Sequence, residues 1–292
     1  MRFELAKVKH IRESAVPWSD RGLLLSIGDF HSDDKACAVD RMKRDIDRAL
    51  TYEAKTGNFV RFLNMGDNVD VMSPSNRRNL KAIKLYDSVH DVFEEACAQS
   101  VEKLQKILEP TKGKWVGMVQ GHHYYEFSDG TTSDTRLAQF LGCPFLGDCG
   151  IVRLQFKDEG GRTRGEHDIW CHHGTGGGKL PTSPGNILYH VSAAFDADSF
   201  LIGHQHKLFT APYDRVYVTR KRPYRVRHRK IQLGSAGGYL RAYQLDSQRQ
   251  GRAQGGYVEK AVFNPTTMGP LKMWFECFTD RGDRVIERTM EV

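Results

Sequence analysis

Apolar runs alternate with amphipathic stretches through the first part of the chain. Residues 22–27 form a short apolar run, typical of a strand buried on both faces. Between Ala36 and Leu50, apolar residues recur at spacings of three and four, which predicts a helix with one buried face. A second apolar run covers residues 58–65. This pattern predicts a strand, a helix and a second strand, the repeating unit of an α/β sheet.

Polar and glycine residues mark the expected helix ends. Asp33 or Asp34 can cap the first helix, and Gly57 ends it. A long helical stretch is expected from about Asn79 to Leu108. Its expected core residues are Leu80, Ile83, Val89, Val92, Phe93, Ala96, Val101, Leu104 and Leu108.

The rest of the chain continues the alternation and then becomes rich in strands. Strands are expected at residues 115–120, 150–156, 167–171 and 199–202, and helices at 133–141 and 186–194, with a β-rich part from about residue 210. The sequence has no internal repeat and no clear linker. A single domain over residues 1–292 is therefore expected.

Composition and charge narrow the class of protein. The 292 residues include 39% hydrophobic residues, and no apolar run reaches the roughly 20 residues of a membrane helix. The N-terminus has no hydrophobic signal-peptide segment, and none of the six cysteines forms a Cys-x-x-Cys pair. A cytoplasmic protein without a membrane partner is expected.

The net charge of +7 is unevenly distributed. Seven Lys or Arg residues lie between Arg220 and Lys230, with Tyr224 among them. The segment is either a solvated hairpin or a surface that contacts phosphate groups, in DNA or RNA for example. In the second interpretation Arg222 and Arg225 would contact the substrate.

Five short polar motifs, each following an apolar run, carry the candidate chemistry. Seven of the twelve histidines fall in these motifs. Open α/β sheets place their ligands at the carboxyl ends of strands, so the five motifs are expected to meet. The motifs are Asp29-Phe30-His31, Gly66-Asp67, Gly121-His122-His123, His172-His173-Gly174 and Gly203-His204-Gln205-His206.

Carboxylates and imidazoles without thiolates are typical ligands of Mn, Fe, Zn or Ni rather than of a structural zinc ion. Asp67 is expected to bridge two ions roughly 3.5–4 Å apart. Adjacent side chains of a strand point to opposite faces, so only one of His172 and His173 can reach the ions, and His173 is the expected one.

The order of these motifs resembles the calcineurin-like metallophosphoesterases. The family pattern is Asp-x-His, Gly-Asp-x-x-Asp, Gly-Asn-His-Asp/Glu, a histidine often followed by glycine, and Gly-His-x-His. The resemblance covers residues 22 to about 210, and it includes Asp70 as the second acid of the Gly-Asp motif. The glycine-rich stretch after His173 and the later Gly234-Ser235 look like phage-borne or prophage-borne members.

The resemblance implies an α/β fold of four layers, α-β-β-α, and two divalent metal ions, with Mn as the first expectation and Ni, Co, Fe or Zn as alternatives. It implies that Asp29, His31, Asp67 and His206 bind the first ion, and that Asp67, His122, His173 and His204 bind the second. His123 would act on the substrate, with Asp70 orienting its imidazole. Asn68, inside the second motif, is also expected to contact the substrate.

One residue departs from the family pattern. The family's asparagine is His122 here, and the acid after the pair is replaced by Tyr124. Imidazole can replace the amide oxygen as a ligand, but it suits Zn, Cu, Fe and Ni better than Mg or Mn. The metal preference is therefore expected to shift.

These observations predict a phosphoester hydrolase in which a hydroxide bridging the ions attacks phosphorus in line. The charge balance and the basic segment favour a phosphodiesterase or nuclease. The alternatives are a phosphomonoesterase acting on small molecules or phosphoproteins, and a catalytically decayed protein that binds nucleic acid through the basic segment.

Overall fold

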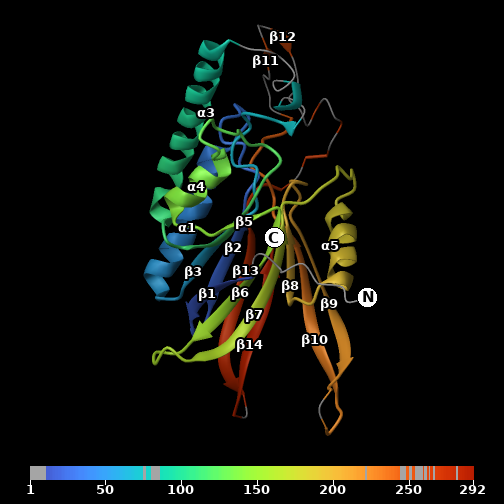
Figure 1. The fold of residues 1–292 in the computed structure, drawn as a ribbon. Helices are drawn as coiled ribbons and strands as arrows, with labels where there is room; N and C mark the ends of the chain where they lie inside the picture. The colour runs from blue at the N-terminus through green and yellow to red at the C-terminus, as the bar shows by residue number, and fades with distance from the viewer. Residues whose placement is uncertain are drawn as a thin grey trace, which may run out of the picture.

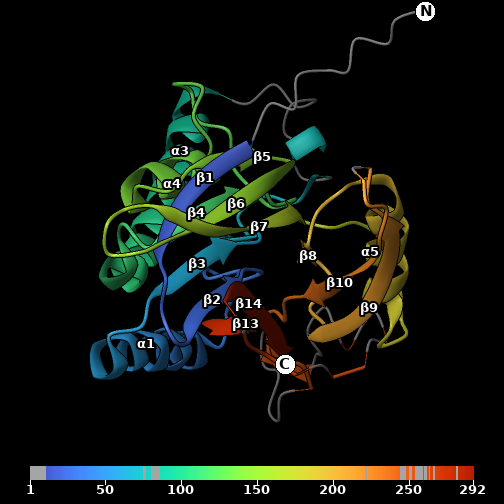
Figure 2. The ribbon, with the colours of Figure 1, turned by 90° about the horizontal axis from the view of Figure 1, so that it is seen from below.

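The computed structural model describes residues 11–74, 77–79, 86–220, 222–243, 248–249, 252–253, 259, 262, 264–265, 267–280 and 282–292. Two six-stranded mixed sheets form the centre of the molecule, and helices cover their outer faces (Figures 1 and 2). The expected α/β fold with four layers is therefore confirmed.

The first sheet has the strand order β14-β13-β2-β3-β4-β5. Its strands β2 to β5 run parallel, and β13 joins β2 in antiparallel orientation. Helices α1, α3 and α4 cover the outer face of this sheet (Figure 2). The bounds are β2 Gly22–Ile27, α1 Val39–Thr56, β3 Val60–Asn64, α3 Asp87–Leu108, a 3-10 turn Glu109–Thr111, β4 Trp115–Val119, α4 Ser133–Leu141, β5 Phe145–Gly147, β13 Leu271–Asp280 and β14 Asp283–Glu291.

The second sheet has the order β1-β6-β7-β8-β10-β9, and α5 covers its outer face (Figure 2). The strands expected at 150–156 and 167–171 are confirmed as β6 and β7, which pair in antiparallel orientation. The bounds are β1 Ile11–Pro17, β6 Cys149–Lys157, β7 Thr163–His172, α5 Ser183–Ala194, β8 Ser199–Ile202, β9 Phe209–Val218 and β10 Val226–Ser235. Two short strands, β11 Gln248–Arg249 and β12 Arg252–Ala253, pair separately.

Three apolar clusters hold the layers together. One fills the space between the sheets, one joins the first sheet to α1, α3 and α4, and one joins the second sheet to α5. All six residues of β2 are buried, as the unbroken apolar run predicted. Burial of both faces fixes the register of this strand, because a slip of one residue would move every side chain to the opposite face.

Two helix predictions need correction. Helix α1 begins after Ala38, which makes no side-chain cap, so neither Asp33 nor Asp34 caps it. Asp34 instead accepts a hydrogen bond from the Ala36 amide in the preceding turn. Gly57 ends the helix in the left-handed conformation, as predicted.

The long helix is shorter than expected, and its apolar residues divide between two halves. Val101, Leu104 and Leu108 are buried, whereas Val92 and Phe93 are exposed. Val89 and Ala96 are exposed as well, because the first half of α3 extends past α4 (Figure 1). Leu80 and Ile83 lie outside the described residues.

None of the described helices is long and apolar enough to cross a membrane. The cytoplasmic location and the single domain over 1–292 stay predictions.

Candidate metal centre

The five motifs meet at one edge of the two sheets. Strands β2, β3 and β4 run parallel in the first sheet, and β7 and β8 run parallel in the second, so their carboxyl ends reach the same side of the molecule (Figure 1). The backbone ties the ends together. The Asp29 amide donates to the Gly66 carbonyl, and the Gly203 amide donates to the His173 carbonyl.

Asp67 lies at the centre of this cluster and is only 2% exposed. Its Oδ2 lies 3.1 Å from His173 Nε2 and 3.7 Å from His31 Nε2. Its Oδ1 accepts a hydrogen bond of 2.8 Å from the His123 amide. Gly121 makes this possible, because a Cβ at that position would collide with the Asp67 backbone and carboxylate.

A first group of ligand atoms comes from Asp29, His31 and His206, and these atoms all lie within 4.8 Å of one another. The His206 Nε2 is 3.9 Å from Asp29 Oδ1, and the His31 and His206 rings stack with centroids 5.2 Å apart. Both Asp29 oxygens accept from the His204 amide, at 3.0 and 2.9 Å. The backbone of one motif thus orients the carboxylate of another.

A second group comes from His122, His173 and His204, again within 4.8 Å. The Nδ1 atoms of His122 and His204 are 3.1 Å apart. His173 donates its Nδ1–H to the Met65 carbonyl at 2.5 Å, which leaves Nε2 directed at Asp67. His172 instead stacks on Trp170 with centroids 5.8 Å apart, so His173 is the member of the pair that reaches the cluster.

His123 and Asp70 lie beside the first group. Their Nδ1 and Oδ1 atoms are 2.7 Å apart, which is the contact that the family resemblance implied. The same oxygen accepts from His31 Nδ1 at 3.0 Å, a second contact that the sequence did not suggest. Burial would raise the pKa of Asp70, but the hydrogen bonds with His123 and His31 hold it well below its usual range. One ionised carboxylate therefore orients both imidazoles.

Five residues of the cluster have left-handed backbones although none is glycine. The φ angles are 48° for Asp29, 43° for His31, 48° for Asp67, 64° for His204 and 51° for His206. Such conformations each cost on the order of 1–3 kcal/mol and occur preferentially at functional sites. These residues follow directly after β2, β3 and β8, where the chain turns at the end of each of these strands.

The ionisation of the cluster leaves several imidazoles neutral. Burial, followed by the positive charges of neighbouring histidines, lowers the pKa of His204 to about 4 and that of His206 to about 3. Burial and His173 lower the pKa of His122 as well. Neutral imidazoles carry the lone pair that a metal ion needs.

The pKa values of two neighbours of Asp67, one carboxyl group and one imidazole, are both raised. Burial raises the pKa of Asp29 to about 7. Burial disfavours the charged form of His173 and would lower its pKa. The attraction of the Asp67 carboxylate outweighs this effect and raises the His173 pKa to about 9. The same attraction keeps the pKa of Asp67 well below its usual range despite its burial. In the absence of a cation, a proton on His173 balances the Asp67 charge.

The donor set fits divalent cations. The Nε2 atoms of His31 and His173 are buried, directed at Asp67 and without an aligned hydrogen-bond partner among the described residues. Buried polar atoms seldom lack a partner, and an ion between these atoms and the carboxylate would provide one. Imidazole and carboxylate ligands without thiolate suit Mn, Fe, Co, Ni or Zn.

Asn68 does not face the place where a substrate would bind, contrary to expectation. It is 1% exposed, its Oδ1 accepts from Asn64 at 2.7 Å, and its Nδ2 donates to Asp134 at 2.9 Å. Asp134 also accepts from the Gly121 amide at 3.0 Å. Asn68 therefore connects the Asp67 turn to the His122-His123 turn from behind.

Arg77 is a second supporting residue that the sequence did not reveal. Its Nη1 donates to the carbonyls of Met72, His122 and Tyr124 at 2.8–3.0 Å, and its guanidinium lies 3.8 Å from the centre of the Tyr124 ring. A lone arginine in a polar stretch gives no signal of such a role. Its three acceptors are backbone atoms, which no residue pattern encodes.

The substrate contacts at Arg222 and Arg225 stay a prediction, but the structure places both residues far from the cluster. Both residues lie in the turn between β9 and β10, at the opposite end of the hairpin from the cluster (Figure 1). Ten residues of strand separate the two ends, roughly 30 Å at 3.3 Å per residue. Lys221, in the same turn, lies outside the described residues.

Comparison with models of protein families and with curated proteins finds no match for this chain. Among solved structures it is similar to a single mutant of Vps29 from Entamoeba histolytica, at 15% identity and a TM-score of 0.39, over 92% of this chain and 99% of that one. It is also similar to a predicted phosphoesterase from Streptococcus pneumoniae, at 10% identity and a TM-score of 0.31, over 93% and 99% of the two chains.

The NAD nucleotidase of Haemophilus influenzae matches at 10% identity with a TM-score of 0.39, over 92% of this chain and 49% of that protein. Likenesses of this size assign no function. The function must therefore be argued from the geometry of the cluster, and the resemblance to phage-borne members stays a prediction.

Proposed function

We propose that the protein is a dinuclear metal-dependent phosphoester hydrolase. The supporting observation is the position of Asp67 between two separate groups of ligand atoms, with Oδ2 3.1 Å from His173 and 3.7 Å from His31. In this proposal Asp67 belongs to both ligand sets. One ion would be held by Asp29, His31, Asp67 and His206, and the other by Asp67, His122, His173 and His204.

Two divalent ions bound there would supply a Lewis-acid pair that activates water and offsets the negative charge on the phosphoryl oxygens. His123 is the proposed catalytic residue of the chain itself. Its Nδ1 is held by Asp70, and this carboxylate can stabilise an imidazolium whose Nε2–H is then free to protonate the leaving oxygen. Asp70 acts through His123 and His31 and is a positioning residue.

Manganese remains the first proposal for the native metal, with nickel, cobalt, iron and zinc as alternatives. His122, His173 and His204 place three imidazoles in one group, and only Asp67 adds a carboxylate to it. This group favours Zn, Ni or Fe, whereas the group with Asp29 suits Mn better. Unequal metal preferences at the two positions are expected.

A phosphodiester, such as nucleic acid, is the proposed substrate, and a small phosphomonoester is the alternative. The net charge of +7 and the basic hairpin turn support a polyanion. The turn lies roughly 30 Å from the cluster, so one duplex would have to span about nine base pairs, at 3.4 Å each, to contact both. Oligonucleotides much shorter than this should gain nothing from the turn.

The experiment is to strip the protein with a chelator, add back one metal at a time, and measure hydrolysis of mono- and bis-(p-nitrophenyl) phosphate together with metal content. We expect two ions per chain and recovery of activity with at least one metal. His206→Asn should lower occupancy in the first group and His204→Asn in the second. The exposed His190 on α5 provides the control, because His190→Asn should change neither readout.

Three outcomes distinguish the alternatives. Faster turnover of the monoester than of the diester would favour the phosphomonoesterase. A protein that binds two ions but hydrolyses neither ester nor any oligonucleotide would support a decayed, binding-only role. Absence of stoichiometric metal under all conditions would exclude the proposed centre.

A further inference from the structure

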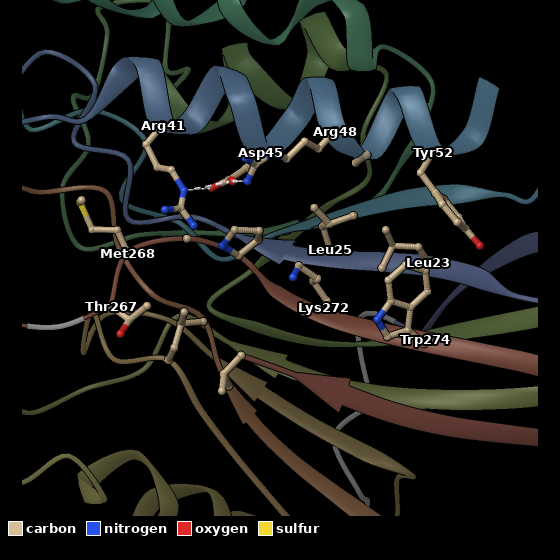
Figure 3. A pocket seen from close by; sticks show the side chains of 15 residues that line it. Leu23, Leu25, Arg41, Asp45, Arg48, Tyr52, Thr267, Met268, Lys272 and Trp274 are labelled. Atoms are coloured by element: carbon tan, nitrogen blue, oxygen red, sulfur yellow. Dashed lines mark hydrogen bonds and ion pairs between the residues drawn. The ribbon is translucent and has the colours of Figure 1, made fainter. Parts of the chain in front are cut away.

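A cleft of about 330 Å³ lies between α1 and β13, away from the cluster around Asp67 (Figure 3). Helix α1 supplies Arg41, Asp45 and Arg48 to one wall, and β13 supplies Lys272 and Trp274 to the other. The buried side chains of Leu23 and Leu25 in β2 form its floor. Its volume falls at the lower end of the range of small-molecule sites, roughly 300–1,000 Å³.

The cleft carries surplus positive charge. Three cationic side chains line it, namely Arg41, Arg48 and Lys272, against the single carboxylate of Asp45. That carboxylate is already engaged, since both of its oxygens accept from Arg41 Nε, at 3.1 and 2.9 Å, and one accepts from Tyr239 at 3.3 Å. Lys272 forms no ion pair with any carboxylate of the described residues.

Trp274, which lines the same cleft, carries an unused hydrogen-bond donor. The Nε1–H of Trp274 is buried and has no partner among the described residues. Arg21 packs 4.5 Å from the centre of the indole ring, and Tyr52 contacts it edge-on at 5.2 Å, so the ring is held in place. In Figure 3 the ring nitrogen lies on the side of the indole nearer Lys272. A buried N–H without an acceptor is costly, and a ligand oxygen would satisfy it.

We propose that this cleft is a binding site for a small molecule with an anionic oxygen-bearing head and an apolar body. The head, a phosphate or a carboxylate, would accept from Lys272, Trp274 Nε1 and the Nη atoms of Arg41. The apolar body would lie over Leu23 and Leu25. The charged side chains of the cleft are three cations and one carboxylate that is already paired, so an anionic ligand is favoured over a cationic one.

The test follows the indole N–H signals of the protein labelled with ¹⁵N. The chain has four tryptophans, and Trp274→Phe assigns the signal that matters. The full-length protein is titrated in chelator with phenyl phosphate and, separately, with benzoate, with benzyl alcohol as the neutral probe. We expect a saturable shift of the Trp274 signal with at least one of the two anions and none with benzyl alcohol. The anion that produces it distinguishes a phosphate ligand from a carboxylate ligand.

Matched variants test whether the anion that shifts the Trp274 signal binds in the cleft. Lys272→Gln and Arg48→Gln should each weaken binding by about tenfold, the effect of losing one charged partner. Arg44 lies one turn before Arg48 on α1, is exposed and does not line the cleft. Arg44→Gln should leave binding unchanged. No saturable shift with either anion, or equal weakening by Arg44→Gln and Lys272→Gln, would overturn the proposal.

Discussion

The cluster around Asp67 and the basic turn between β9 and β10 are both rich in ionisable side chains, yet they differ in almost every physical respect. The cluster is buried, its ligand atoms lie within 4.8 Å of one another in each group, and backbone amides hold its carboxylates. The turn is exposed, and Arg222 contacts Tyr224 with 5.6 Å between the guanidinium carbon and the ring centre. Charges fixed in a buried site interact strongly, whereas exposed charges are screened by solvent and salt. Substitutions should therefore have large effects in the first region and small ones in the second.

The largest effect is expected for Asp67→Asn. The substitution removes the charge that both ligand groups are proposed to share, so hydrolysis should fall by about 10³-fold or more and metal occupancy should fall with it. Turnover of bis-(p-nitrophenyl) phosphate and metal analysis measure the two quantities. Asp47→Asn, on the exposed face of α1, is the control. A variant that kept two ions and full activity would remove Asp67 from its proposed bridging role.

Asp70→Asn should have the next largest effect. Loss of the carboxylate releases both His123 and His31, and removal of such supporting partners commonly costs 10–100-fold in activity or metal affinity. Because an imidazole without its carboxylate partner is no longer oriented, kcat for bis-(p-nitrophenyl) phosphate should fall even at saturating metal. An unchanged kcat at saturating metal, with Asp91→Asn as the exposed control on α3, would limit Asp70 to a structural role.

Metal affinity should rise with pH. Below a pKa of about 9, His173 carries a proton that an ion must displace, and below about 7 Asp29 does as well. Apparent affinity should therefore increase by up to about tenfold per pH unit between pH 7 and 9, and more steeply below 7. Calorimetric titrations of chelator-treated protein in buffers of different ionisation enthalpy would detect the released protons. A pH-independent affinity over this range would contradict the assignment of His173 as a ligand.

The smallest effect is expected for the double variant Arg222→Gln and Arg225→Gln. Both side chains are exposed and lie roughly 30 Å from the cluster, so hydrolysis of a small diester and thermal stability should be unchanged, within about 0.5 kcal/mol. Binding of a long DNA or RNA should weaken, with a salt dependence smaller by about 0.9 in log–log slope for each lost duplex contact. Identical nucleic-acid binding by parent and variant would show that the turn only keeps the protein soluble.

The same comparison shows what the sequence can predict. Strand-end motifs were informative because strand direction, burial and side-chain periodicity together determine where a residue at the end of a strand must lie. Strand 22–27 and helix 133–141 were located correctly for the same reason. The basic segment carried no such constraint, and only the length of the β9–β10 hairpin shows how far it lies from the cluster.

Other features depended on contacts between distant parts of the chain. Asn68 belongs to a motif by sequence, but Asp134, 66 positions later, turns its side chain away from the cluster. Arg77 acts on backbone carbonyls, and the exposed Val92 and Phe93 follow from how far α3 extends past α4. Helical periodicity predicts which residues share a face, but it does not predict what covers that face.

The left-handed backbones of the cluster lower the stability of the protein relative to a chain without this strain. His206 adopts a φ of 51°, which glycine tolerates and alanine does not. Of two variants that both lack the imidazole, His206→Gly should therefore be more stable to denaturant than His206→Ala by about 1 kcal/mol, the reverse of their order in ordinary backbone. Five residues of the cluster carry this backbone strain, which lowers the stability of the protein without bound ions. In the proposed centre, the binding of ions to these residues would offset that cost.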